Sequence, residues 1–259
     1  MMTEAKTKEK KPLNNSLIIK RIAFDAIFSA ITVVLYIFAK FNIPIFPSFL
    51  DINFSMIPVI ICAFMLGPWD AGIVVIIRCL LKWAFVGSGT GYVGELADVL
   101  IGLAACLPAG AIYHYTNLKH KTLLSFIMVC AGWILMGILS NIFINIPWYT
   151  NLYFKENYYE TGVAQPLVGM CSDAFKLITF GNFTSLNKDN FMFYYILLAI
   201  IPFNLFLSLI VVLVTFPIHK RLRVLYDMID FNKKNNNGDK SIIEEENSIE
   251  NDEDDKEAL

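Results

Sequence analysis

The chain has 259 residues, of which 56% are hydrophobic and 17% charged, and its formal net charge is −2. This balance lies outside the usual range for a soluble globular domain and indicates an integral membrane protein. We expect no nucleic-acid partner.

Six apolar segments predict membrane helices. They are Ile22–Ala39, Phe54–Leu66, Ala71–Val86, Val93–Tyr115, Thr122–Trp148 and Phe191–Ile218. The first, fourth, fifth and sixth reach or approach the roughly 20 residues that a bilayer core requires, whereas the second and third are short. The first is longer than the apolar region of a signal peptide, so we expect it to remain as a helix. The predicted fold is therefore all-α, with six transmembrane helices.

The positions of lysine and arginine predict the orientation, because cytoplasmic loops hold an excess of both. These residues precede the first segment, separate the fourth from the fifth, and follow the sixth. Six spans with both termini in the cytoplasm place all three basic flanks on one side. We predict a basic tail over residues 1–15, a transmembrane domain over 16–225, and a disordered acidic cytoplasmic tail over 226–259.

The first outer loop combines backbone stiffness with an apolar character. Pro44 and Pro47 favour extended backbone, while Phe49 and Leu50 make the loop too apolar for a water-exposed surface. Non-helical backbone at membrane depth is tolerated only where protein buries it or where it lines a cavity. The loop is interpreted as an ordered lid or wall of a small-molecule pocket; a hairpin lying among lipid headgroups is the alternative.

Small residues mark one face of the first helix. Ala26 and Ala30 lie four residues apart, so they stack on the same face and allow another helix to approach closely. This face is interpreted as a docking site for a partner, or as a packing face for a neighbouring span of the same chain.

Charged residues inside the third and fourth segments need partners or water. Arg78 and Lys82 lie one turn apart, as do Glu95 and Asp98, so we expect the two pairs to face each other. Glu95 also follows a glycine-rich turn, residues 87–91, that permits close approach of a ligand. It is a candidate acceptor for a polar ligand, with a purely structural ion pair as the alternative.

Amide side chains lie in the last two apolar segments. Asn141 and Asn145 are near the outer end of the fifth, and Asn204 follows Pro202 in the sixth. An amide offers both a donor and an acceptor, which suits the edge of a planar heterocycle. Nearby aromatic residues, including Phe203, either stack on such a ring or form an interfacial belt.

No recognisable catalytic motif accompanies these features. The three histidines lie near cytoplasmic helix ends without a nucleophile beside them, the five cysteines lack metal-ligand spacing, and a phosphate-binding loop is missing. We therefore expect no catalytic residue, metal site or cofactor. Energy for transport against a gradient would come from another protein.

Four motifs carry a family resemblance. They are Phe46–Pro58, Leu66–Pro68, Gly89–Asp98 and Pro202–Leu205. Together they resemble the riboflavin-binding S component, or substrate-binding subunit, of energy-coupling factor (ECF) transporters. The resemblance extends from Ile22 to Arg223.

The resemblance implies a six-helix protein of the bacterial plasma membrane that captures riboflavin from outside as its transported ligand. It also implies a partner module of one coupling transmembrane protein, which would meet Ala26 and Ala30, and two ATPase subunits, so the chain itself is not an enzyme. The ligand contacts it implies are Phe49, Leu50, Glu95, Asn141 and Asn204, and we add Thr90 and Phe203 as neighbouring candidates.

The sequence departs from the family pattern at two places. Leu207 occupies a position where the family commonly has lysine, and residues 180–189 resemble an insertion in the connection between the fifth and sixth segments. An S component for another vitamin or flavin analogue is one alternative function. A self-sufficient secondary transporter is another, although no repeat relates the first three segments to the last three.

Overall fold

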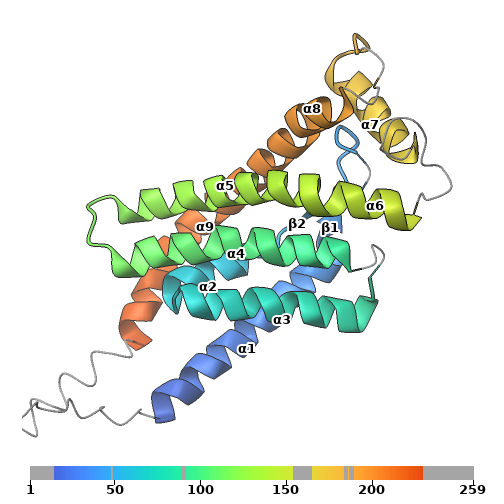
Figure 1. The fold of residues 1–259 in the computed structure, drawn as a ribbon. Coiled ribbons are helices and arrows are strands. Elements are labelled where there is room, and N and C mark those ends of the chain that lie inside the picture. Colours follow the sequence, from blue (N-terminus) through green and yellow to red (C-terminus); the bar gives the residue numbers. More distant parts are fainter. Residues whose placement is uncertain are drawn as a thin grey trace, which may run out of the picture.

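A computed structural model describes residues 15–47, 49–88, 92–153, 165–183, 186 and 190–229. Its elements begin with helix α1 and a two-stranded antiparallel hairpin, followed by three helices. Their bounds are α1 Asn15–Phe38, β1 Lys40–Phe41, β2 Ile52–Asn53, α2 Met56–Met65, α3 Pro68–Val86 and α4 Val93–Tyr115. Two long composite helices and one shorter helix complete the described fold (Figure 1).

Each composite helix contains one wide π turn. The first joins α5 Lys121–Ser140, the π turn η1 Asn141–Asn145 and α6 Ile146–Tyr153. The second joins α8 Phe191–Tyr195, the π turn η3 Ile196–Ile200 and α9 Ile201–Ile229. Helix α7, Gln165–Ile178, lies between them in sequence.

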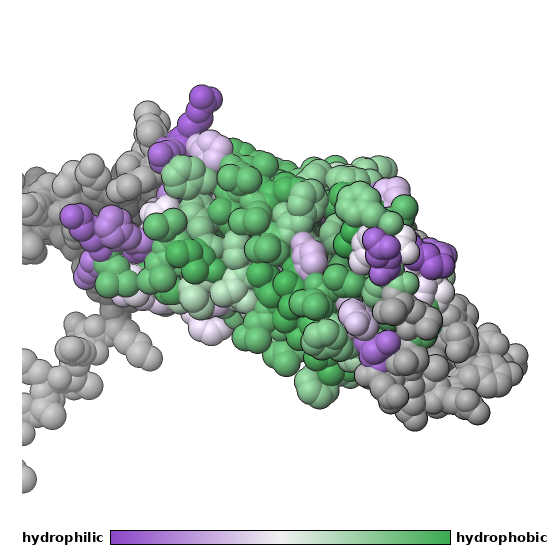
Figure 2. Space-filling view, turned by 90° about the horizontal axis from the view of Figure 1, so that it is seen from above, coloured by the Kyte–Doolittle hydropathy of each residue, from purple (hydrophilic) through white to green (hydrophobic). Residues whose placement is uncertain are grey.

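Four helical stretches of the described chain are long and apolar enough to cross a membrane. They are Ile18–Phe38, Val93–Tyr115, Lys121–Asn151 and Phe191–Arg221. These correspond to the first, fourth, fifth and sixth predicted segments. Helices α2 and α3 form where the short second and third segments were predicted, and Figure 2 shows hydrophobic residues across the middle of the molecule with hydrophilic residues toward its two ends.

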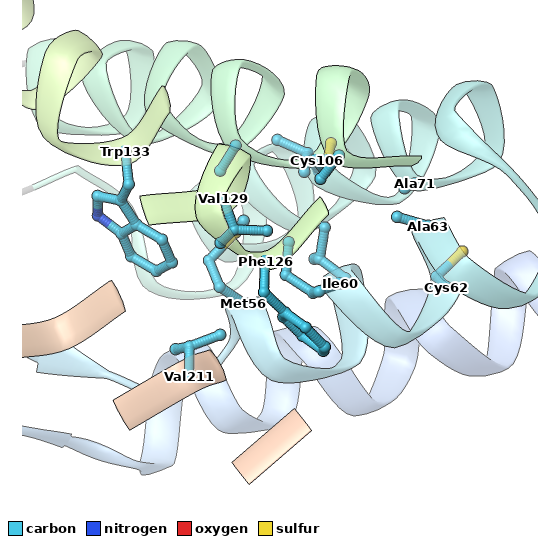
Figure 3. Close-up of a cluster of buried hydrophobic side chains, with 14 of the residues drawn as sticks. Met56, Ile60, Cys62, Ala63, Ala71, Cys106, Phe126, Val129, Trp133 and Val211 are labelled. Carbon is cyan, nitrogen blue, oxygen red and sulfur yellow. The ribbon is translucent and has the colours of Figure 1, made fainter. Parts of the chain in front are cut away.

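Helix α2 is the centre of the hydrophobic core. Nine of its ten residues are buried, as expected for a short helix that is apolar on all sides. Figure 3 shows Met56 and Ile60 of α2 among side chains from the surrounding helices, including Val129 and Trp133 of α5 and Val211 of α9. The shortness of this segment therefore reflects enclosure by other helices.

The two ends of the bundle differ in what they contain (Figure 1). One end carries the start of α1, the end of α9 and the α4–α5 connection, and we call it the closed end. The other carries the β1–β2 hairpin, the α3–α4 connection and α7, and we call it the pocket end. The basic flanks of the sequence analysis therefore share the closed end.

Helix α7 was missed by the sequence analysis, which treated residues 149–190 as a connection. It is amphipathic: Leu167, Cys171 and Phe175 are buried against α8 and η3, whereas Asp173 and Lys176 face outward. A search for continuous apolar runs does not find a helix of this kind. The predicted insertion at residues 180–189 follows α7 and is described only in part, and of the predicted tails only residues 15 and 226–229 are described.

Candidate functional site

A cavity of about 180 Å³ lies at the pocket end. Its walls come from α1, the β1–β2 hairpin, α2, α3, α4, the α5–α6 composite helix and α9. Six of the seven residues predicted as ligand contacts line this one cavity: Phe49, Leu50, Glu95, Asn141, Phe203 and Asn204. The seventh, Thr90, lies outside the described residues.

The β1–β2 loop forms the roof of this cavity. Lys40 pairs with Asn53 and Phe41 with Ile52 in the hairpin, and Ile52 is fully buried. The ring of Phe46 meets the ring of Phe203 edge-on, with 5.3 Å between their centroids. These contacts confirm the prediction that the loop is ordered and packs inward against the helices.

The tip of the loop is fixed against the second composite helix. Phe49 packs on Tyr195 with ring centroids 6.2 Å apart, and both Phe49 and Leu50 are half-buried. The side chain of Asn42 donates a hydrogen bond to the carbonyl oxygen of Leu50 at 2.9 Å. The loop conformation therefore depends on α8, which lies about 145 residues away in the sequence.

Amides form one wall of the cavity. Asn141 Nδ2 donates to the carbonyl oxygen of Gly137 at 2.8 Å, and Asn204 Nδ2 donates to that of Ile200 at 2.8 Å. Gly137 also lets the two amides approach, because a Cβ built there would lie 2.8 Å from Asn204 Cγ. Asn204 of α9 thus packs against Gly137 of α5, one turn before Asn141.

Both amides lie at or near π turns. Asn141 begins η1, which lines the cavity, and η3 ends four residues before Asn204. A π turn adds one residue to a helical turn and is frequent at functional sites. No local pattern in the sequence indicates these turns, although the predicted ligand contacts Asn141 and Asn204 lie at or near them.

Charged groups form the opposite wall. Lys82 makes a salt bridge with Glu95, and Glu95 also accepts a hydrogen bond from Ser88 Oγ at 2.8 Å. Arg78 is buried and donates to Ser55 Oγ at 2.7 Å and to the backbone oxygen of Asp98 at 3.4 Å. The prediction that these helix faces meet is confirmed. Glu95 both forms an ion pair with Lys82 and lines the cavity.

Tyr36 joins the charged wall to α1. Its hydroxyl donates to the carboxylate of Asp98, and the guanidinium of Arg78 lies over its ring, 5.0 Å from the centroid. Trp133 of α5 adds an aromatic surface to the cavity. Sequence reasoning missed Tyr36 and Trp133, because a buried aromatic residue in a membrane helix carries no local signal of a ligand pocket.

The side chain of Leu207 also lines the cavity and is buried. The wall at this position is therefore apolar. Within the described part of the chain, no group of three or more His, Cys, Asp or Glu residues could hold a metal ion.

Ala26 and Ala30 lie outside the cavity, on an exposed face of α1. The adjoining side of the helix carries the buried residues Ser29, Thr32, Val33 and Tyr36. The two alanines are thus exposed among the described residues, and docking of a partner on them stays a prediction. The alanine face is available to a partner.

Comparisons with known proteins agree with this architecture. A family model described as "ECF transporter, substrate-specific component" matches residues 20–219. Among solved structures, one titled "Structure and mechanism of the S component of a bacterial ECF transporter" matches with a TM-score of 0.54 and 26% identity, covering 80% of this chain and 98% of the other.

Two similar relatives have names that state a substrate. "Riboflavin transporter RibU" of Staphylococcus aureus (strain TCH60) is 34% identical over 132 residues, which are 50% of this chain and 67% of the relative. "Riboflavin transporter FmnP" of Bacillus subtilis (strain 168) is 31% identical over 134 residues, 51% of this chain and 70% of the relative. Since the family model covers most of the chain, the protein belongs to the substrate-specific components of ECF transporters.

Proposed function

We propose that this chain is the riboflavin-binding subunit of an ECF-type uptake transporter in a bacterial plasma membrane. The observation that carries the proposal is a cavity in which aromatic rings, asparagine amides and a charged wall converge beneath an inward-folded loop. Such a cavity suits a ligand with a flat heterocycle and a polar side chain. The relatives named riboflavin transporters support this choice of ligand.

In this proposal the chain crosses the membrane six times, with both termini in the cytoplasm. The shared position of α1's start, α9's end and the basic α4–α5 connection supports this orientation (Figure 1). The pocket end then faces outside. The tails at residues 1–15 and 226–259 extend into the cytoplasm from a substrate-binding domain at 16–225.

The ring of riboflavin would lie between the loop residues Phe49 and Leu50 and the amide wall of Asn141 and Asn204, with Phe203 stacking beside it. Its hydroxylated chain would point toward Glu95 and the charged wall, with Thr90 as a further contact. The cavity of about 180 Å³ is smaller than the roughly 300–1,000 Å³ usual for ligand pockets. Binding of riboflavin would therefore require this cavity to widen.

The subunit would deliver riboflavin through a coupling module of one transmembrane protein and two ATPase subunits. The exposed Ala26 and Ala30 support docking of the coupling protein on α1, because small residues let two helices approach closely. This chain would hydrolyse no ATP, so transport by the subunit alone is not expected.

Uptake of labelled riboflavin by a bacterium that lacks its own riboflavin uptake would test this function. Cells that express the chain together with the coupling module should accumulate riboflavin, and cells that express the chain alone should not. Uptake without the module would favour a self-sufficient secondary transporter. Uptake of a different vitamin but not of riboflavin would show that the ligand is that vitamin.

The docking face can be tested separately. Leucine at both Ala26 and Ala30 should abolish uptake and co-purification of the coupling protein, while riboflavin binding by the isolated subunit stays unchanged. Ala131→Leu, at another exposed alanine of a long helix, is the matched control. Normal uptake by the double variant would contradict docking at this face.

A further inference from the structure

The carboxamide of Asn141 is held at both of its ends. Its Nδ2 donates to the carbonyl oxygen of Gly137, and its Oδ1 accepts hydrogen bonds from the Tyr195 hydroxyl at 2.8 Å and from Asn145 Nδ2 at 3.2 Å. An amide oxygen has two lone pairs. The oxygen of Asn141 is therefore saturated, and its nitrogen, which carries a second N–H, is the group left for a ligand.

Asn145 has the opposite character. Its Nδ2 is used by Asn141, while its Oδ1 is buried and lacks a hydrogen-bond partner among the described residues. Both asparagines line the cavity. A buried acceptor without a partner is costly, so a ligand or water is expected to donate to it.

Tyr195 determines this arrangement from outside the cavity. It is completely buried, stacks on Phe191 with centroids 5.6 Å apart and a 9° interplanar angle, and is not among the cavity-lining residues. Phe49 of the loop and the buried face of α7 belong to the same apolar cluster. The apolar side chains around the ring of Tyr195 therefore hold its hydroxyl toward Asn141.

We propose that Tyr195 is a positioning residue that sets the hydrogen-bond pattern of the amide wall. With the Asn141 oxygen occupied, the wall presents an N–H of Asn141 next to the Oδ1 of Asn145. This pattern selects a ligand edge with a carbonyl beside an N–H, as in a cyclic imide. The inference rests on the proposed function and deepens it, because the pyrimidine part of the flavin ring carries such an edge.

A double-mutant cycle tests whether Tyr195 acts through Asn141. Riboflavin affinity would be measured by flavin fluorescence for the wild-type chain, Tyr195→Phe, Asn141→Ala and the double variant. We expect Tyr195→Phe to weaken binding about tenfold, the double variant to bind no more weakly than Asn141→Ala alone, and Tyr194→Phe, the matched control on the same helix, to bind normally. Additive losses, or an unchanged Tyr195→Phe, would overturn the inference while leaving the proposed function intact.

A ligand analogue supplies a readout that a general loss of packing would not change. The wild-type chain should bind riboflavin at least about tenfold more tightly than the analogue methylated on the imide nitrogen. This preference should shrink in Tyr195→Phe and vanish in Asn145→Leu, which preserves side-chain size and leaves Tyr195 intact. An undiminished preference in Asn145→Leu would overturn the inference, and failure of the wild-type chain to bind any flavin would overturn the proposed function together with it.

Discussion

The closed end and the pocket end of the bundle are held together by different kinds of contact. At the closed end, helices approach until backbones touch: a Cβ on Gly110 of α4 would lie 3.0 Å from the Cα of Pro68 in α3. Aromatic rings fill the remaining space, with Phe64 packed on Tyr113 and Tyr113 hydrogen-bonded to His219 at 2.9 Å. This end is tightly packed.

At the pocket end the same helices are separated by polar groups and wide turns. Asn141, Asn204 and the pair Lys82–Glu95 place amides and charged groups beside the cavity. The two ends therefore differ in that polar side chains of the pocket end line a cavity. Substitutions at the two ends should therefore affect different properties of the protein.

The largest effect on stability is expected for a substitution of Gly132. This residue precedes Trp133 in α5 and packs closely against α4. A Cβ added there would overlap the carbonyl oxygen of Ala104, which is backbone and cannot move aside. Gly132→Ala should destabilise the fold by more than about 3 kcal/mol. Thermal unfolding in detergent would measure this.

Gly169→Ala is the matched control for that experiment. Gly169 also lies in a helix, α7, but a Cβ there would meet nothing within 4 Å. This variant should be neutral or slightly more stable, because alanine favours a helix over glycine by about 1 kcal/mol. Equal unfolding temperatures for both variants would contradict the described α4–α5 contact.

The charged wall should give the next largest effect. Lys82→Met leaves the carboxylate of Glu95 without its cation, and the side chains of this pair are only 19% and 10% exposed. We expect a loss of roughly 3 kcal/mol in stability, at the lower end of the range for a buried pair. Adding Glu95→Gln should restore most of the stability but not riboflavin affinity.

The exposed pair Lys176–Asp173, with 3.9 Å between its charged atoms, supplies the control for the charged wall. Lys176→Met should change stability by less than about 1 kcal/mol. If it were as costly as Lys82→Met, burial would not explain the strength of the Lys82–Glu95 pair.

The amide wall should mainly affect binding. Asn204→Ala removes a buried side chain of the cavity, and we expect riboflavin affinity to fall by about 2 kcal/mol, or roughly 30-fold. Asn151→Ala is the control, since Asn151 likewise donates to a carbonyl four residues earlier, at 2.9 Å, but is exposed. Similar losses in both variants would show that helix stability, and not ligand contact, is being measured.

The smallest effect is expected at Trp133. Trp133→Phe keeps an aromatic ring at the boundary between the two ends, so affinity should fall by less than about tenfold. Trp69→Phe, at an exposed tryptophan of the closed end, should bind riboflavin normally. A complete loss of binding in Trp133→Phe would mean that the indole makes a specific contact.

Much of this architecture could be predicted from the sequence, because the patterns that indicate it lie within short segments of the chain. The apolar runs gave α1 to α4 and both composite helices, and the paired charges on α3 and α4 face each other as their spacing predicted. Pro44 and Pro47 correctly indicated an ordered loop. Each of these features follows from bilayer thickness, helical periodicity or proline geometry.

The remaining features depend on contacts between distant segments. Tyr195 resembles any other aromatic residue in its helix until folding brings its hydroxyl to Asn141, 54 positions away in sequence. The π turns likewise follow from packing, which no local pattern records. All seven candidate ligand contacts stay predictions: six of them line the cavity, and Thr90 lies outside the described residues.

The central claim is that a single cavity beneath the β1–β2 loop binds riboflavin. Titration of the purified full chain with riboflavin, followed by flavin fluorescence, tests it most directly, with Asn204→Ala measured alongside. We predict quenching that saturates at one riboflavin per chain and that requires higher concentrations in the variant. Riboflavin fluorescence that stays constant as protein is added, or identical curves for both chains, would contradict the claim.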